Sequence, residues 1–267
     1  MDSNVLTAIL LGILEGLTEF LPVSSTGHLI LASELLGFTG ESSVTFKIAI
    51  QFGAILAVLV VYWKRFWGVG IGLLHRRPDD IAFTRNVLLG FAPALVIGVL
   101  AYEAVRAAIQ TPMIVAVALI VGGVLMLVLE RVVKTVRFTS VEAMSFGTAL
   151  TIGLVQCIAM IPGVSRSGAT ILGALMMGVE RRTAAEYSFF LAVPTMLAAT
   201  VYALWKDRAL LNPDDFGMIA IGFGMAFITA LFVVKAFVAI VSRYGFTPFA
   251  WYRIAAGSIA LIALLMR

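Results

Sequence analysis

Charged residues are scarce in this sequence. They make up 13% of its 267 residues, whereas hydrophobic residues make up 61%. A water-soluble domain has about 25% charged and about 45–50% apolar residues, so a soluble globular protein is excluded. The apolar residues come in runs of about 17 to 25, which are long enough to cross a bilayer as helices. We therefore expect one all-α polytopic membrane domain over residues 1–267.

Other features are missing as well. Apolar runs such as 114–129 do not alternate with polar residues, so the pattern of a transmembrane β-barrel is absent. The single cysteine, Cys157, has no partner for an intrachain disulfide. No basic residue precedes the first apolar stretch, so we expect no cleavable signal peptide. The small net charge of +4 comes from basic residues in loops, which fits membrane topology better than nucleic-acid binding.

The apolar runs predict six full membrane spans, at residues 46–63, 86–102, 112–129, 185–205, 216–240 and 248–266. Two more apolar stretches, 5–36 and 143–178, are interrupted by VSSTGH and by PGVSRSGA. Irregular backbone persists inside a bilayer only where protein or a water-filled cavity satisfies its hydrogen bonds. Both stretches are therefore predicted to be re-entrant helix-loop-helix hairpins. The basic tract 64–85 is interpreted as a cytoplasmic loop held by anionic lipid.

The two interrupted stretches resemble each other at an offset of 141 residues. The matching positions are 23–27 with 164–168, Glu15 with Gln156, and Gly12 with Gly153. LLGFAPA at 88–94 also resembles AIGFGMA at 220–226. We interpret the chain as a duplicated unit of one hairpin and three spans, approximately 1–130 and 131–267. An odd number of crossings per unit makes the second copy run inverted, as in many transporters.

Basic residues are distributed unevenly over this topology. The side that holds the N-terminus carries Arg106, Lys206, Arg208 and Arg267, with Lys47 at its border. The opposite side carries Lys64, Arg65, Arg76, Arg77, Arg85, Arg131, Lys134, Arg137, Arg181, Arg182 and Arg243. The richer side is expected to be cytoplasmic, so the two loops should meet near the midplane and open to the non-cytoplasmic side. For Lys235 and Arg253, toward the ends of spans, snorkelling is favoured, with pairing or lining the cavity as the alternatives.

Two acidic residues lie inside the first interrupted stretch. Glu15 and Glu19 are four residues apart on a helical segment and therefore project from one face. Two carboxylates this close repel each other unless one is protonated or a cation lies between them. A hard divalent ion such as Mg²⁺ or Ca²⁺ suits both as oxygen ligands. The pair is a candidate metal site, with a cation or proton path as the alternative.

A cluster of hydroxyl residues follows the two glutamates. Ser24, Ser25 and Thr26 precede Gly27 at the start of a new helix, where backbone N–H groups and hydroxyls can bind an anion. His28 lies three residues after Ser25, near enough on a helical turn to exchange a proton with it. The alternatives are helix capping for the hydroxyls and a structural role for the histidine.

The second interrupted stretch contributes Arg166, again at the start of an apolar helix. Its planar guanidinium suits phosphate oxygens, and the alternative is a structural counter-ion for one of the two glutamates. Both loops together supply carboxylates, a hydroxyl, an imidazole and a guanidinium, which are the groups that phosphoryl transfer requires. The residues expected to bind substrate are Ser24, Thr26, Gly27, Gln51, Gly163, Ser165, Ser167 and Gly168.

The strings EGLTEFLPVSSTGH at 15–28 and PGVSRSGAT at 162–170 closely resemble the two signatures of the bacterial undecaprenyl-diphosphate phosphatases, also called the bacitracin-resistance family. FKIAIQFGAILAV and EYSFFLAVPTM are similar to that family too, so the resemblance covers nearly the whole chain. It implies an enzyme of the bacterial inner membrane that converts undecaprenyl diphosphate to undecaprenyl phosphate, recycling the carrier lipid for peptidoglycan synthesis. It also implies bacitracin tolerance and dependence on a divalent cation.

The functional residues of the family match five positions in this sequence. The resemblance implies catalytic roles for Glu15, Glu19, Ser25, His28 and Arg166. We expect Ser25 to attack the terminal phosphorus while His28 moves a proton, with His28 itself or a metal-bound water as alternative nucleophiles. The expected partners are the lipid substrate and the bilayer, with a homodimer left open.

The main alternative function is a polyprenyl-phosphate transporter or flippase, because inverted repeats with broken helices are typical of transporters. An ion channel fits less well, since the positive charge of Arg166 would oppose cation passage. An enzyme would be active in detergent without a gradient, whereas a transporter would have nothing to transport there.

Overall fold

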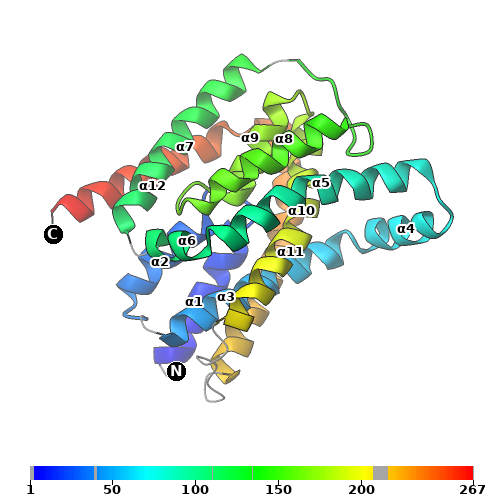
Figure 1. Cartoon of the computed structure of the whole chain (residues 1–267). Helices are drawn as coiled ribbons and strands as arrows, with labels where there is room; N and C mark the ends of the chain where they lie inside the picture. Colours follow the sequence, from blue (N-terminus) through cyan, green and yellow to red (C-terminus); the bar gives the residue numbers. More distant parts are fainter. Residues whose placement is uncertain (1–2, 39–40, 110, 134, 207–215, 267) are drawn as a thin grey trace.

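A computed structural model describes residues 3–38, 41–109, 111–133, 135–206 and 216–266 (Figure 1). Its helices are α1 Ser3–Thr18, α2 Ser25–Leu35, α3 Glu41–Val61, α4 Trp63–Leu74, α5 Pro78–Leu100, α6 Tyr102–Ile109, α7 Pro112–Val132, α8 Phe146–Gln156, η1 Cys157–Met160, α9 Arg166–Met176, α10 Arg181–Lys206, α11 Phe216–Tyr244 and α12 Thr247–Leu265. The all-α prediction is confirmed over these residues. Lys134, Arg208 and Arg267, which entered the charge count, lie outside the described residues.

Six helices are long and apolar enough to cross a membrane, which confirms the predicted spans. They are α3 over Ser43–Val61, together with α5, α7, α10, α11 and α12 over their full lengths. The boundaries agree with the prediction to within four residues, except that α5 begins at Pro78 rather than near residue 86. Pro78 in the first turn, followed by Asp79 and Asp80, favours a helix start there.

The interpretation of the tract 64–85 as a loop is wrong. Most of it is helical, because α4 follows α3 after a short break and only three residues separate the end of α4 from the start of α5. Both basic residues of α4, Lys64 and Arg65, lie in its first turn, and the rest of the helix is apolar or glycine, which favours a helix in contact with lipid or protein over a polar loop. Arg65 forms an ion pair with Glu142, and its guanidinium lies 4.5 Å from the ring centroid of Phe83.

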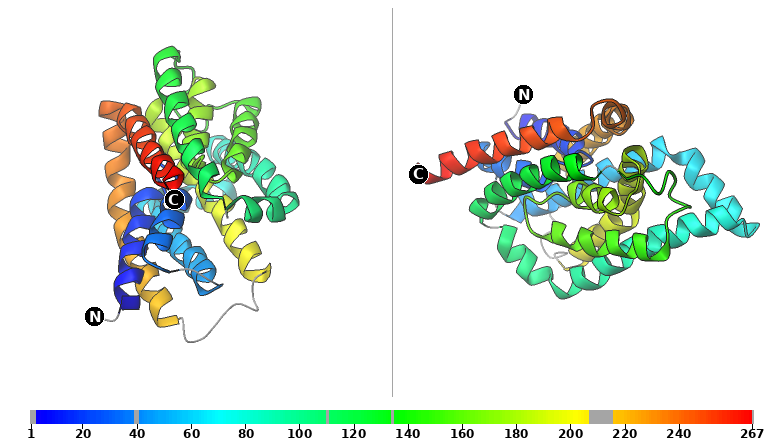
Figure 2. Two further views of the ribbon diagram at one scale, coloured as in Figure 1. Left: turned by 90° about the vertical axis from the view of Figure 1, so that its left-hand side faces the viewer. Right: turned by 90° about the horizontal axis from the view of Figure 1, so that it is seen from above.

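The helices associate in three close groups (Figures 1 and 2), and α10 packs against α3, α5, α9 and α11. α1 and α3 both pack against α11, α7 packs along α12, and α8 packs against α5. Glycines permit two of these approaches. A Cβ atom on Gly12 of α1 would collide with the Gly222 backbone of α11, and one on Gly153 of α8 would lie 2.5 Å from the Gly90 oxygen of α5. Each interrupted stretch is therefore packed by its first helix against a span.

Both predicted helix breaks are present. The first separates α1 from α2, and the second separates η1 from α9. The two loops meet, since Ser167 Oγ donates a hydrogen bond to the Leu21 carbonyl oxygen at 2.7 Å. Phe20 in the first loop is fully buried and packs edge-on against Phe189 of α10, with ring centroids 5.5 Å apart. These contacts place both loops beside α10.

Buried polar groups connect α5, α10 and the segment that leads into α8. Asn86 Nδ2 donates to the carbonyl oxygens of Val141 at 2.8 Å and Met144 at 3.0 Å. Tyr187 Oη donates to the Asn86 carbonyl oxygen at 2.7 Å. A buried polar group left without a partner would be destabilising, so these bonds favour a single arrangement of the segment before α8 on α5 and α10.

Candidate active site

The two helices that follow the breaks begin in the same way. Ser24 and Ser165 adopt positive φ angles of 71° and 76°. The Ser24 side chain accepts a hydrogen bond from the Gly27 N–H at 3.4 Å, and the Ser165 side chain accepts one from the Gly168 N–H at 3.1 Å. A backbone conformation with positive φ costs about 1–3 kcal/mol in a residue other than glycine, and such residues tend to occur at functional sites.

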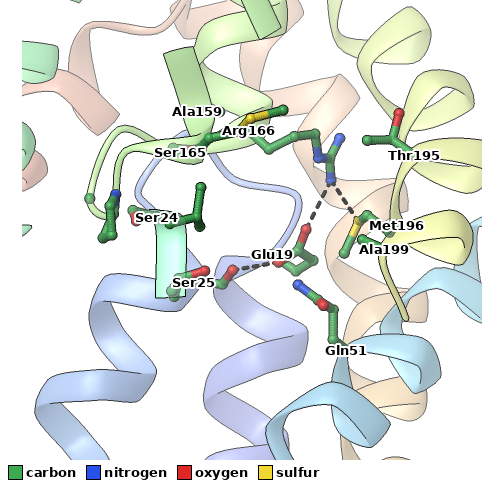
Figure 3. A pocket seen from close by; sticks show the side chains of 15 residues that line it. Glu19, Ser24, Ser25, Gln51, Ala159, Ser165, Arg166, Thr195, Met196 and Ala199 are labelled. Carbon is green, nitrogen blue, oxygen red and sulfur yellow. Dashed lines mark hydrogen bonds and ion pairs between the residues drawn. The ribbon is translucent and has the colours of Figure 1, made fainter. Parts of the chain in front are cut away.

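A cavity of about 210 Å³ lies between the two loops, α3 and α10 (Figure 3). Eight of the thirteen predicted site residues line it, namely Glu19, Ser24, Ser25, Thr26, Gln51, Gly163, Ser165 and Arg166. The other five, Glu15, His28, Gly27, Ser167 and Gly168, do not line it. The structure therefore brings the two sequence motifs together around one space.

Glu19 lies between Ser25 and Arg166 in this cavity (Figure 3). Its Oε2 atom accepts a short hydrogen bond from Ser25 Oγ, and its Oε1 atom lies 3.0 Å from Arg166 Nη2. Arg166 also donates through Nη1 to the Ser188 carbonyl oxygen at 2.8 Å. The Glu19 and Arg166 side chains are only 4% and 13% exposed. A buried and hydrogen-bonded ion pair of this kind holds both groups in one orientation.

Glu15 is fully buried one turn before Glu19, and neither of its side-chain oxygens has a hydrogen-bond partner in the described part of the protein. A carboxylate without a partner is costly to bury, so it fits either a proton or a cation held jointly with Glu19. Among the described residues, no group of three or more His, Cys, Asp or Glu is arranged to hold a metal. A divalent ion would therefore need further oxygen ligands from the substrate or from water.

His28 points away from the cavity. Its Nδ1 atom is hydrogen-bonded to the Ser24 carbonyl oxygen at 2.8 Å, and its Nε2 atom to Tyr252 Oη of α12 at 2.6 Å. The imidazole lines a separate, mostly apolar cavity of about 470 Å³ that is bordered by α2 and α12. Although His28 follows Ser25 by less than one helical turn, the two side chains face different cavities. In this structure the imidazole is hydrogen-bonded to Ser24 and Tyr252 and not to the Ser25 hydroxyl, so the predicted direct proton exchange would require the ring to move.

α10 contributes residues to the site that were not predicted from the sequence. Thr195 and Met196 line the cavity, and Met196 Sδ lies 3.4 Å from Arg166 Nη2. Ser188 accepts from Arg166 through its carbonyl oxygen and receives a hydrogen bond from Thr170 Oγ1 at 2.8 Å. The string EYSFFLAVPTM, singled out only for its resemblance, carries all three α10 residues. The polar residues Ser188 and Thr195 inside an apolar span were the signal that could have found them.

The prediction that Arg253 snorkels is wrong. The residue is only 1% exposed, and its guanidinium donates to backbone carbonyl oxygens of both loops. The expectation came from its position toward one end of a span. The helix breaks leave carbonyl oxygens without helical partners, and these oxygens provide acceptors that a sequence pattern does not reveal.

An apolar groove of about 640 Å³ adjoins the cavity. Its walls come from α3, α5 and α10, and five of its residues also line the cavity: Gln51, Val105, Met160, Thr195 and Ala199. The groove continues along α10 past Tyr202 to Trp205. A polar cavity with charged groups therefore opens directly onto a long apolar surface.

Known proteins match the chain over almost its full length. The bacitracin resistance protein BacA family matches residues 8–259. An undecaprenyl-diphosphatase from Sphingopyxis alaskensis is 69% identical over 261 residues, which cover 98% of each chain. One from Rhizorhabdus wittichii is 60% identical over 267 residues and covers both chains completely. Undecaprenyl-diphosphatase 2 from Paramagnetospirillum magneticum is 52% identical over 263 residues, 98% of this chain and 100% of its own. With a match of this extent, the chain belongs to the bacitracin resistance protein BacA family.

Proposed function

We propose that this protein is a membrane phosphatase that hydrolyses undecaprenyl diphosphate to undecaprenyl phosphate and inorganic phosphate. The names of its relatives support this substrate. The observation that carries the proposal is the Ser25, Glu19 and Arg166 cluster, in which a hydroxyl, a carboxylate and a guanidinium meet in one buried cavity. The reaction would return the carrier lipid to peptidoglycan synthesis and would support bacitracin tolerance.

The substrate would lie across the cavity and the groove. The diphosphate fits the polar cavity, where Arg166 and the N–H groups at the starts of α2 and α9 would bind its oxygens. The first isoprene units fit the apolar groove, which begins at the shared residues. The rest of the long tail would extend into the bilayer.

Ser25 is the proposed nucleophile. As its oxygen bonds to the terminal phosphorus, the proton would pass to the Glu19 oxygen that already accepts its hydrogen bond. The bond from the terminal phosphorus to the bridging oxygen would break, releasing undecaprenyl phosphate. Water would then cleave the phosphoserine, releasing phosphate. Arg166 would stabilise the charge on the equatorial oxygens throughout.

A divalent cation, Mg²⁺ or Ca²⁺, is proposed as the cofactor. When bound by Glu15 and Glu19, it would neutralise charge on the phosphate oxygens. The unpartnered oxygens of Glu15 support this role. His28 would act indirectly, because its ring is hydrogen-bonded to the carbonyl oxygen of Ser24 beside the nucleophile. The alternative in which His28 is the nucleophile would require the ring to leave Tyr252.

The proposed architecture is an inverted repeat of residues 1–130 and 131–267, with the two interrupted stretches as re-entrant hairpins. Two reciprocal observations support it. Gly12 packs on Gly222 of the other half, and its counterpart Gly153 packs on Gly90, which lies in the matching segment of the first half. The two positive-φ serines of the loops lie 141 residues apart, the offset of the sequence match.

The proposed location is the bacterial inner membrane, with the cavity opening to the non-cytoplasmic side. The excess of basic residues on the opposite side supports this orientation. A diphosphate released there by cell-wall assembly would reach the cavity without crossing the membrane. Homodimer formation stays a prediction.

The first prediction concerns phosphate release by the purified protein in detergent, measured with undecaprenyl diphosphate, with and without a chelator. Wild type is expected to release phosphate in a metal-dependent manner. Glu19→Gln and Arg166→Ala are expected to lower kcat/KM at least about 100-fold, because each removes charge from the reacting centre. Glu186→Gln and Arg182→Ala are matched controls, since this exposed pair lies outside the cavity.

The outcomes separate the candidate functions. Metal-dependent release that is lost only in the cavity variants would support the phosphatase. If folded wild type released no phosphate with any divalent metal, the phosphatase proposal would be wrong. The meeting of two broken helices would then favour lipid transport, and Arg166 would be a counter-ion of Glu19.

A further inference from the structure

Arg253 of α12 is the largest fully buried side chain of the described residues. All its N–H groups donate to backbone carbonyl oxygens. The acceptors and distances are Pro22 at 3.0 Å, Val164 at 2.9 Å, Gly163 at 3.0 Å, Ala118 at 3.1 Å and Leu119 at 3.3 Å. Because every N–H group of the guanidinium is bonded to a backbone carbonyl oxygen, this one side chain connects several segments of the protein.

The acceptors lie at the two helix breaks and on α7. Pro22 precedes Ser24 by two residues, and Val164 comes directly before Ser165. One nitrogen atom, Nη1, donates to both Pro22 and Val164, so a single atom joins the two loops. Nη2 and Nε connect the same group to α7. The positions of both strained serines thus depend on one side chain that does not line the cavity.

Space for this side chain is provided by glycine. A Cβ atom on Gly122 of α7 would collide with Arg253 Nη2 and would lie 2.8 Å from its Cζ atom. A Cβ atom on Gly168 would lie 3.3 Å from Nη1. The buried guanidinium has no carboxylate partner among the described residues, so its charge is balanced only by carbonyl dipoles near the cavity. An ordinary structural arginine would be paired.

We propose that Arg253 is the positioning residue that holds the two catalytic loops together, and that its charge adds to the attraction of the site for a diphosphate. It acts through the carbonyl groups before Ser24 and Ser165, and it touches neither substrate nor metal. The inference rests on the proposed phosphatase function for its kinetic part alone. Lysine in its place would keep the charge but could not reach five carbonyl oxygens in a fixed plane.

The kinetic test compares Arg253→Lys, Arg253→Gln and Gly122→Ala with wild type, using undecaprenyl diphosphate. Arg253→Lys is expected to lower kcat about 10- to 100-fold with little change in KM, because a small displacement of reacting groups has this effect. Arg253→Gln should also raise KM several-fold because the positive charge is lost. Gly122→Ala should also lower kcat, because the added methyl group would displace the Arg253 guanidinium. Arg243→Lys and Gly224→Ala are matched controls, being an exposed arginine and a glycine with open space around it.

A second measurement is independent of activity. Hydrogen exchange of Arg253→Lys in detergent is expected to be at least about tenfold faster at residues 20–28 and 161–169, and unchanged in α11. Faster exchange throughout the protein would mean a general stabilising role and would overturn the proposal. Unchanged loop exchange with wild-type kcat would overturn it as well. If wild type itself released no phosphate, the phosphatase function would fail while the exchange data still decided whether Arg253 holds the loops.

Discussion

The two carboxylate oxygens of Glu19 have different partners, and each partner is thereby suited to a different role in the reaction. Ser25 donates to one oxygen, and the Arg166 guanidinium pairs with the other. Arg166 is therefore already oriented before a phosphate arrives, held from behind by the Ser188 carbonyl oxygen. Such preorganisation lowers the reorganisation required at the transition state. Losing either charge would leave the other buried without an opposite charge beside it.

Replacing Ser25 tests the proposed nucleophile. Ser25→Ala is expected to lower kcat at least about 1000-fold, because the attacking oxygen and its proton path are both lost. Single-turnover reaction with substrate labelled in the terminal phosphate, followed by mass spectrometry, is expected to find phosphoserine at position 25 in wild type.

The matched control for this variant is Ser33→Ala. Ser33 lies on the same helix, is buried, and its hydroxyl has no hydrogen-bond partner in the described structure, so the variant should keep its activity. Retention of most activity by Ser25→Ala, without any labelled residue in wild type, would instead favour direct attack by water.

Among the elements, the interrupted stretches depend on close helix contacts. α8 approaches α5 at Gly153 and α1 approaches α11 at Gly12, so backbone meets backbone at both places. In lipid, small residues of this kind drive helix association because they allow extensive van der Waals contact. The loops that form the cavity are continuous with these helices, so the packing also determines where the loops lie.

Enlarging one of these glycines should destabilise the packing of α8 on α5. In Gly153→Ala the new methyl group would lie 2.5 Å from the Gly90 carbonyl oxygen, which is too close to tolerate without a backbone shift. Overpacking of this kind costs about 1–3 kcal/mol, so thermal unfolding in detergent should occur several degrees lower. Gly147→Ala, on the same helix and with nothing nearby, should unfold at the wild-type temperature or slightly above. Equal unfolding temperatures for the two variants would contradict the packing seen here.

At the scale of the whole molecule, a charged cavity opens onto an apolar groove that runs between spans. The molecule thus offers one region for each end of an amphipathic lipid. The apolar cavity beside His28 and Tyr252 shares no lining residue with the charged cavity. This difference provides a test of which surface holds the tail.

Filling the groove should weaken binding of long-tailed substrate. Ala203→Trp is expected to raise KM for undecaprenyl diphosphate about tenfold, since the indole would displace a few buried methylene groups of the tail. Isopentenyl diphosphate, whose tail is too short to reach position 203, should be hydrolysed as by wild type. Ala256→Trp, in the other apolar cavity, is the matched control and should change neither value. A rise in KM for undecaprenyl diphosphate with Ala256→Trp alone would move the tail to that cavity.

Much of this protein was predictable because the relevant signals are local. Long apolar runs with few charges define spans wherever they occur, and Pro, Gly and hydroxyl residues interrupt a helix at their own positions. The six spans, both helix breaks and eight residues of the cavity were therefore found from the sequence. The prediction for the tract 64–85 was wrong because its basic residues suggested a loop, whereas most of them lie at the start of α4 or in the short connection between α4 and α5.

The orientation of individual polar groups depends on contacts between segments that are distant in the sequence. His28 turns toward Tyr252, which is 224 residues away in the chain, and no local pattern links the two. Arg253 is buried rather than exposed because two loops and α7 present carbonyl oxygens to it from three distant segments. Which segments enter the membrane, and where they break, can be read from the residues of each segment, because both depend on how that segment is solvated. Which side chains satisfy the broken backbone depends on neighbours that folding alone brings into contact.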